Sequence, residues 1–154
     1  MESEKTVHKH VSDLGSGAYL LMHGYKALGR DGRDIVFEIT ESKWRTFEEQ
    51  KNEYLNSEFH RFDACLMSLK KSSEYVPLNG SECKKVNDLG AAAYAMAHGF
   101  KFVGREGKSI LFQVVESEIK DFQEKQLEFI QHDCTFKQFD SCIMSLKRIG
   151  YYEG

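Results

Sequence analysis

The sequence predicts an α+β fold made of two tandem copies of a helix–β-hairpin–helix–helix unit, packed with pseudo-twofold symmetry. The first observation is that the run beginning at Val11 aligns without a gap with the run beginning at Val86, and that FDACLMSLKK later matches FDSCIMSLKR. Roughly 27 of about 60 aligned positions are identical, and self-similarity of this extent indicates an internal repeat. The second observation is that helix-like apolar spacing flanks two short β-prone runs in each copy.

The copies occupy residues 1–72 and 84–154, and residues 73–83 form the linker between them. This linker contains Pro77, the only proline in the chain. One copy of about 65 residues buries a smaller fraction of its surface than a larger domain does. We therefore expect the two copies to pack together as a pseudo-dimer within one chain, which is itself a monomer or a homodimer.

The first element of each copy is a short helix. Asp13 and Asp88 are good N-cap residues, because their side-chain oxygens can accept hydrogen bonds from the first turn. Apolar residues follow at helical spacing. Gly24 and Gly99 then stand where a left-handed C-cap residue is expected.

A β-hairpin follows, turning near Asp31 in the first copy and near Glu106 in the second. A two-residue loop would put Lys26 on the same face as Phe37, whereas a three-residue loop of residues 30–32 gathers the apolar side chains. The pattern therefore predicts the three-residue loop. The buried face would then carry Tyr25, Ala27, Ile35, Phe37 and Ile39, and in the second copy Phe100, Phe102, Ile110, Phe112 and Val114.

The opposite face of the hairpin is too apolar for a freely solvated surface, on which polar residues would alternate with the buried ones. Four residues on this face form a candidate interface: Leu28 and Val36 in the first copy, and Val103 and Leu111 in the second. We expect another surface to cover part of it.

Two further helices close each copy. The first is indicated by Trp44, Phe47, Tyr54 and Leu55, and by Ile119, Phe122, Phe129 and Ile130. The second is indicated by Phe62, Cys65, Leu66 and Leu69, and by Phe139, Cys142, Ile143 and Leu146. The runs TVHKHV and CKKV, which precede the first helices, are too short for their pattern to decide between strand and coil.

Composition and motifs argue against several classes of protein. The net charge of −3, with 21 basic against 24 acidic residues, does not favour a protein that coats duplex DNA. No run is long enough to span a membrane, no CxxC pair is present, and the N-terminal run lacks the apolar core of a signal peptide. We therefore expect a reduced, cytoplasmic location and no membrane partner.

Metal, cofactor and catalytic sites are not predicted. The histidines and cysteines, including His132 near Cys134, do not supply the two close pairs that structural zinc requires. Cys65 and Cys142 lie on an apolar helix face, where a thiol behaves as a small hydrophobe. No glycine-rich phosphate loop, GxSxG or HExxH is present, so we expect no enzymatic activity.

Basic residues recur at equivalent places in the two hairpins. Each copy reads HG-aromatic-K and then GR-acid-G-basic, which presents Arg or Lys to phosphates or to an acidic partner. The alternative is that these charges only keep a hairpin edge soluble. The six candidate binding residues are Lys26, Arg30, Arg33, Lys101, Arg105 and Lys108.

The run DLGSGAYLLMHGYKALG, followed by IVFEI and the closing FDACLMSLKK, resembles a small domain of unknown function from short bacterial, archaeal and phage proteins. The resemblance covers nearly all of each copy. It implies a prokaryotic or phage origin and supports the copy boundaries, but it supplies no catalytic residues. Because this chain carries two such domains, the resemblance implies that a family homodimer is mimicked here by covalent fusion.

Two hypotheses about function follow. The leading one is a non-enzymatic binding protein that uses the basic hairpin tips to bind nucleic acid or an acidic protein surface. The alternative is a structural, assembly or protein-interaction protein, encoded by a phage, and is motivated by the apolar second face of the hairpin and the C-terminal run IGYYEG.

Overall fold

The computed structural model describes residues 5–75, 83–131 and 134–153. It is a mixed α+β structure, as predicted, and it divides into two compact units. Unit 1 comprises Met1–His60 with Gln138–Gly154, and unit 2 comprises Arg61–Lys137. Pro77, most of the expected linker and His132 lie outside the described residues.

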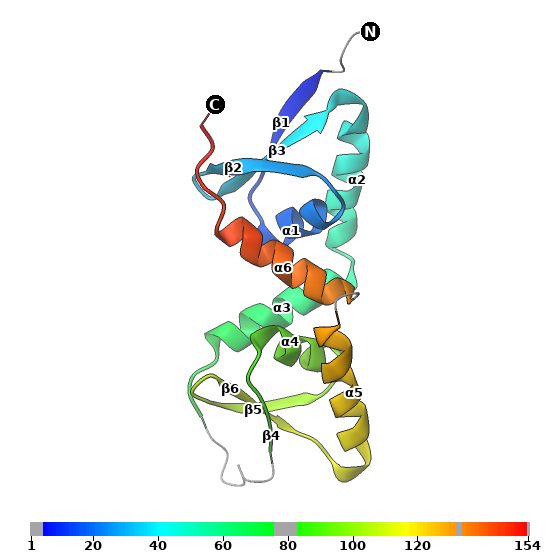
Figure 1. The fold of residues 1–154 in the computed structure, drawn as a ribbon, viewed down its shortest axis with the longest axis vertical. Coiled ribbons are helices and arrows are strands. Elements are labelled where there is room, and N and C mark those ends of the chain that lie inside the picture. Colours follow the sequence, from blue (N-terminus) through cyan, green and yellow to red (C-terminus); the bar gives the residue numbers. More distant parts are fainter. Residues whose placement is uncertain (1–4, 76–82, 132–133, 154) are drawn as a thin grey trace. The chain divides into compact units, whose positions relative to one another are not determined.

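Unit 1 contains a three-stranded antiparallel sheet in the order β1-β3-β2. Its elements are β1 (Thr6–Val11), α1 (Leu14–Met22), β2 (Lys26–Asp31), β3 (Asp34–Thr40), the short 3₁₀ helix η1 (Glu41–Lys43), α2 (Trp44–Tyr54) and most of α6 (Thr135–Lys147). In Figure 1 the segment that follows α6 runs beside β2.

Unit 2 contains a second antiparallel sheet in the corresponding order β4-β6-β5. Its elements are most of α3 (Glu58–Lys71), β4 (Lys84–Val86), α4 (Leu89–Ala97), β5 (Lys101–Glu106), β6 (Ser109–Gln113), the 3₁₀ helix η3 (Glu116–Glu118) and α5 (Ile119–Ile130). The run TVHKHV thus forms β1, and the last three residues of CKKV form β4.

The compact units do not follow the expected boundaries at residues 72 and 84. Helix α3 belongs mainly to unit 2, and helix α6 belongs mainly to unit 1. Each unit is therefore closed by the helix that the sequence alignment assigns to the other copy. The physical reason is that both helices bury the same type of apolar stripe, so that either one presents a suitable face.

The first helix of each unit is capped as predicted. The carboxylate of Asp13 accepts a hydrogen bond from the backbone N–H of Ser16, and Asp88 accepts one from Ala91. Gly24 and Gly99 both have a φ of 94°, a left-handed conformation that a side chain disfavours.

The hairpin loop was predicted with the wrong length. Asp31 pairs with Asp34, so the turn consists of two residues, Gly32 and Arg33. A β-bulge between Ala27 and Gly29 adds one residue to β2, and beyond it Ala27 pairs with Phe37. The predicted apolar face is therefore preserved by a bulge and not by a longer loop. The second hairpin has the equivalent bulge between Phe102 and Gly104.

Aromatic rings form the centre of each unit. Phe47 on α2 packs against Phe37 on the sheet, with ring centroids 5.8 Å apart, and meets Tyr25 edge-on at 5.1 Å. In unit 2 Phe122 on α5 meets Phe112 at 5.6 Å and Phe100 at 5.1 Å.

The predicted apolar faces of α2 and α5 are only partly buried. Phe47 and Tyr54 on α2 are buried, as are Phe122 and Phe129 on α5, whereas Trp44, Leu55 and Ile130 are about half exposed. These exposed side chains lie at or just beyond the helix ends, where the helix contributes less to the unit core. Among the described helices, none is long and apolar enough to cross a membrane.

Candidate binding surfaces on the two sheets

Each sheet has an inner face that packs against helices and an outer face on the opposite side. In unit 1 the inner face carries Ile35 and Phe37, because a Cβ atom built on Gly17 of α1 lies within 4 Å of both. The cross-strand pairs His8–Glu38 and His10–Val36 therefore lie on the outer face. Among the candidate residues of unit 1, strand register places Lys26 and Val36 on this outer face, whereas Arg30 pairs with Ile35 of the inner face.

The candidate interface residues are not open on this surface. Val36 and Leu111 are both 0% exposed, and Leu28 and Val103 are half-buried. The central residue of this face is therefore buried in each sheet. In unit 1, part of the cover comes from residues 149–153, which follow α6.

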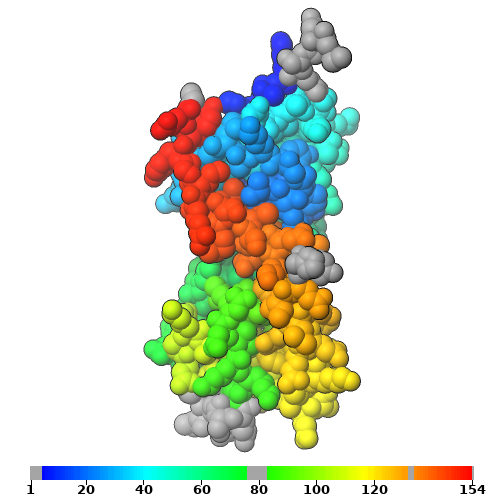
Figure 2. All heavy atoms as spheres, in the orientation of Figure 1, coloured from blue at the N-terminus to red at the C-terminus, as the bar shows by residue number. Residues whose placement is uncertain are grey.

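This C-terminal segment forms a parallel bridge with the outer edge of β2. The N–H of Arg30 donates to the carbonyl of Gly150 at 2.9 Å, and the N–H of Tyr152 donates to the carbonyl of Arg30 at 2.8 Å. The red C-terminal residues lie against the blue residues of unit 1 on the face shown in Figure 2. A sheet edge that would otherwise be open is thus paired.

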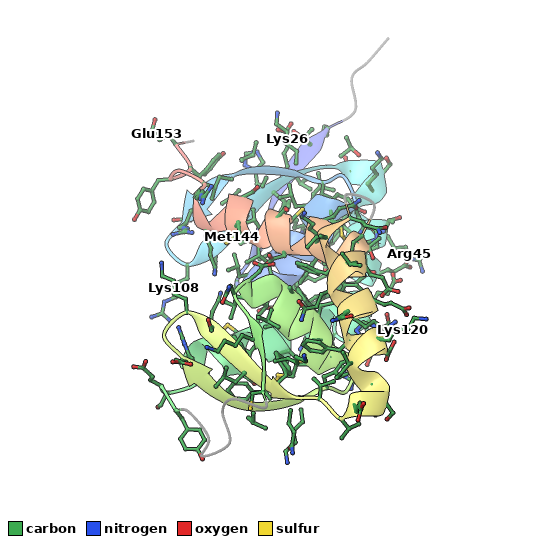
Figure 3. The ribbon with its side chains drawn as sticks, turned by 60° about the horizontal axis from the view of Figure 1, so that its bottom comes forward. Lys26, Arg45, Lys108, Lys120, Met144 and Glu153 are labelled. Carbon is green, nitrogen blue, oxygen red and sulfur yellow. The ribbon has the colours of Figure 1, made fainter. Side chains whose placement is uncertain are left out.

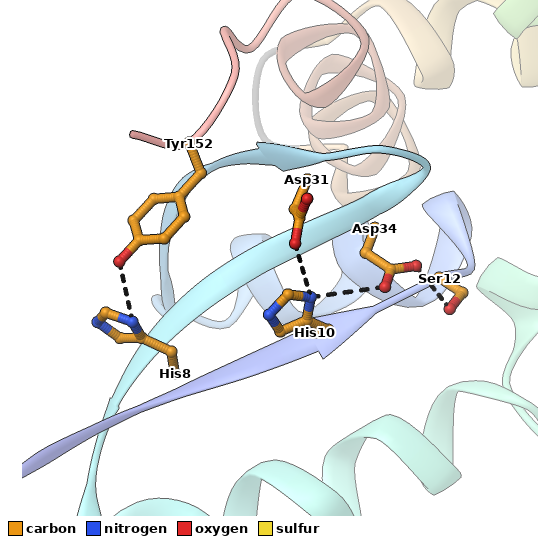
Figure 4. Close-up of polar contacts among 6 residues, drawn as sticks. All are labelled: His8, His10, Ser12, Asp31, Asp34 and Tyr152. Carbon is orange, nitrogen blue, oxygen red and sulfur yellow. Dashed lines mark hydrogen bonds and ion pairs between the residues drawn. The ribbon is translucent and has the colours of Figure 1, made fainter. Parts of the chain in front are cut away.

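The side chain of Tyr152 extends from β2 to β1. Its hydroxyl forms a hydrogen bond with Nδ1 of His8 at 3.0 Å, and the two rings meet edge-on at 5.5 Å (Figure 4). Because β3 is the middle strand, this side chain crosses β3 on the outer face, where Val36 lies. Residues 149–153 of the run IGYYEG thus pack within unit 1.

Arg30 is a structural residue and not a free charge at the hairpin tip. Its guanidinium donates to the carbonyl of Leu146 at 3.1 Å and to that of Lys147 at 3.3 Å. These carbonyls end α6, where unpaired acceptors and the helix dipole favour a cation. Arg30 therefore holds the last turn of α6 against β2.

Arg105 has a similar place in unit 2. Its Nε donates to the carbonyl of Gly107 at 2.9 Å, and Nη1 lies 3.5 Å from the carbonyl of Ser72, just after α3. Its backbone exchanges two hydrogen bonds with Tyr75, of 2.8 and 2.6 Å. Both arginines therefore contact the segment that follows the third helix of their unit.

The other four candidate cations are exposed. Lys26 forms an ion pair with Glu38, with Nζ 3.7 Å from the carboxylate oxygen, whereas Lys101 pairs across the strands with the neutral Gln113. Arg33 and Lys108 occupy the second position of the two-residue turns, and neither bonds to another described residue. Figure 3 shows Lys26 and Lys108.

The two outer faces differ in charge. Around Lys26 and Arg33, the described face of unit 1 carries three acidic residues: Asp31, Asp34 and Glu38. By strand register the described outer face of unit 2 carries Lys85, Lys101 and Glu106, and Lys108 lies in the adjoining turn, where Glu74 accepts a hydrogen bond from the N–H of Gly107. Lys85 and Glu106 form an ion pair at 3.3 Å, which leaves two lysines without an acidic partner there.

The histidines have local partners. His10 Nδ1 lies 3.5 Å from Asp34 and 3.8 Å from Asp31, and Asp34 also accepts from the Ser12 hydroxyl at 2.9 Å (Figure 4). His23 Nδ1 donates to the Tyr19 carbonyl at 2.8 Å. In the part of the chain that the structure describes, no group of three His, Cys, Asp or Glu residues is arranged to hold a metal ion.

Two of the four cysteines lie in surroundings that disfavour a reactive thiolate. Cys65 and Cys142 are half-buried on the third helices, and burial raises the pKa of both thiols. At Cys65 the charge of Arg61 opposes this effect of burial, without reversing it. A raised pKa lowers the fraction of thiolate, which is the reactive species. No disulfide joins any of the four cysteines.

Two shallow pockets lie within the units. One of about 310 Å³ in unit 1 brings Lys43, Thr46 and Gln50 together beside Tyr25. The other, of about 340 Å³ in unit 2, lies between the end of β4 and the exposed Leu127 and Ile130 of α5. The wall of the first pocket also includes His23, whose Nδ1 is bonded to the Tyr19 carbonyl, and both walls offer contacts for binding.

Comparison of the chain with protein-family models, with curated proteins and with solved structures found no match. The resemblance to small prokaryotic and phage domains therefore stays a prediction. No family or class of protein follows from these comparisons.

The charge difference between the two outer faces was not predicted, although the aligned copies contain a signal for it. Alignment of the copies sets Glu38 against Gln113, and Asp34 against Ser109. Both changes remove an acidic residue from the second copy. The six basic residues alone do not reveal this difference, because basic residues occur at equivalent positions in both copies.

Proposed function

We propose that this protein is a non-enzymatic binding protein that contacts a polyanionic partner, either nucleic acid or an acidic protein surface, through the outer face of the unit 2 sheet. The single observation that carries the proposal is the excess of lysine on that face and in its adjoining turn. Lys101 and Lys108 are exposed and have no acidic partner among the described residues. Lys85 adds a third cation, shared with Glu106.

The expected interaction is weak and sensitive to salt. Each phosphate that a lysine neutralises releases condensed counterions, and about three such contacts give a slope of log K against log salt of about −2 to −3. Lysines also bind phosphate as point charges without the planar geometry of arginine, so we expect little sequence preference.

The proposal includes an origin by tandem duplication, with the two copies packed around a pseudo-twofold axis. The duplication is supported by the common strand order, by the capping residues Asp13 and Asp88, and by the two-residue turns with equivalent bulges. In this view the outer faces diverged after duplication. The second copy lost acidic residues and acquired the binding role.

The test is fluorescence anisotropy with labelled single-stranded and double-stranded oligonucleotides and with an acidic peptide, each over a range of salt concentrations. Changing Lys101 and Lys108 together to Glu should abolish binding. The matched control changes Lys26 and Arg33 to Glu at the equivalent positions of unit 1 and should retain most of it. Equal loss in both variants, or none in either, would reject the assignment to unit 2.

The alternative function is protein interaction through α5. Leu127 and Ile130 on this helix are 58% and 54% exposed and border the pocket of about 340 Å³. Exposed apolar side chains beside a pocket are a common feature of protein interfaces. Changing both residues to Ser would remove binding of a protein partner and leave polyanion binding intact, so the two functions can be separated.

A further inference from the structure

Each compact unit is completed by a segment from the other half of the chain. Residues 5–60 form a sheet and two helices that are closed by residues 138–153, whereas residues 83–137 are closed by residues 61–75. The exchange is reciprocal, because each half both supplies and receives a third helix.

The closing segment of unit 1 contributes to its core. Phe139 is fully buried and lies 5.8 Å from Tyr54 in a stacked arrangement. Leu146 is also buried and lies against Gly17 of α1, where an added Cβ would be only 3.2 Å from its Cδ1 atom. Hydrogen bonds of the Arg30 side chain and of the Tyr152 backbone hold the end of the segment on β2.

The closing segment of unit 2 makes the corresponding contacts. Phe62 is fully buried between Phe129, at 6.0 Å, and Phe136, at 5.5 Å. After the helix, Tyr75 exchanges two backbone hydrogen bonds with Arg105. Each segment therefore combines an apolar helix face with a strand-like end on a sheet edge.

The two helices carry closely similar contact residues. Phe62, Leu66 and Leu69 are the buried residues of α3, and Phe139, Ile143 and Leu146 are those of α6. Each unit therefore has a receptor surface for a helix of this one pattern. A surface that buries aromatic and aliphatic side chains in this way has the character of an obligate interface.

We propose that the two halves of the chain, residues 5–75 and 83–153, are noncovalent binding partners that hold each other through this exchange of third helices. The covalent connection through residues 76–82 is not required to keep them together. The partner that each half fits is the other half of the same chain.

The experiment starts from the full chain with a specific protease site inserted in residues 76–82. After the folded protein is cut, native mass spectrometry and size-exclusion chromatography should show both halves in one particle. The melting temperature of the cut protein should now rise with protein concentration, because the two halves must associate to fold. That of the uncut protein should be independent of concentration.

A pair of variants tests whether the third helices carry the association. Leu146→Ala removes a buried contact of α6, whereas Met144→Ala changes an exposed residue of the same helix. In the cut protein we expect Leu146→Ala to weaken the association of the halves by at least tenfold, and Met144→Ala to leave it unchanged.

Separation of the cut parent protein into two folded monomers at micromolar concentration would overturn the proposal, because each half would then close on its own third helix. The same conclusion would follow if the two variants associated equally tightly. If Leu146→Ala did not fold even before cutting, the behaviour of the cut parent protein would still decide.

Discussion

Replacing Arg30 with Ala tests whether this residue is structural or a surface charge. The change removes two hydrogen bonds to the end of α6, of 3.1 and 3.3 Å, and leaves the carbonyls of Leu146 and Lys147 without this donor. A hydrogen bond from a charged group contributes about 1.5–3 kcal/mol, and a cation near an exposed helix C-terminus about 0.3–1 kcal/mol. Arg30 is half-buried, so solvent reduces the larger of these figures.

We therefore expect Arg30→Ala to lower the free energy of unfolding by about 1–2 kcal/mol, which for a chain of this size corresponds to about 3–6 °C in Tm. The measurement is urea unfolding followed by circular dichroism. The control is Arg33→Ala, only three residues away but exposed and unbonded to other described residues, for which we expect a change within about 0.5 kcal/mol. Equal effects of the two substitutions would refute the capping role of Arg30.

Three other outcomes are expected. Phe37→Ala should destabilise the protein by about 3–5 kcal/mol in the same unfolding assay, because the ring is fully buried and its removal leaves a cavity. Gly29→Ala should release residues 149–153 from β2 and expose them to carboxypeptidase, since an added Cβ would lie 2.9 Å from the Tyr152 backbone. Cys65 and Cys142 should react slowly with iodoacetamide near pH 8, and faster as pH rises, because burial raises the pKa of both thiols; alkylation as fast as in the unfolded chain would contradict this.

The elements of the fold were largely predictable because their signals are local. The capping residues Asp13 and Asp88 and the left-handed Gly24 and Gly99 mark the first helices directly. The β-bulge beside Gly29 was not predictable from the alternation of apolar and polar residues. A bulge and a longer hairpin loop both shift the pairing of the two strands in the same direction, so the alternation does not distinguish them. The close approach of the Tyr152 backbone to Gly29 adds a constraint that depends on a distant segment.

The exchange of third helices was not predictable for a different reason. A pattern of apolar residues indicates that a helix has a buried face. It does not indicate which other surface of the protein packs against that face. Phe62 and Phe139 occupy the same position in closely similar helices, so the sequence is equally compatible with either arrangement. The role of Arg30 was missed for the same reason, since its acceptors lie 116 residues away in the sequence.

The exchange has a consequence for how the protein folds during synthesis. Unit 2 is continuous in the chain, whereas residues 5–60 leave the ribosome well before residues 138–153, which complete unit 1. At about 5–20 residues per second, the delay is about 4–16 s or longer. During this delay the outer edge of β2 has no strand partner. Unit 2, whose synthesis begins second, is therefore the first unit that can finish folding.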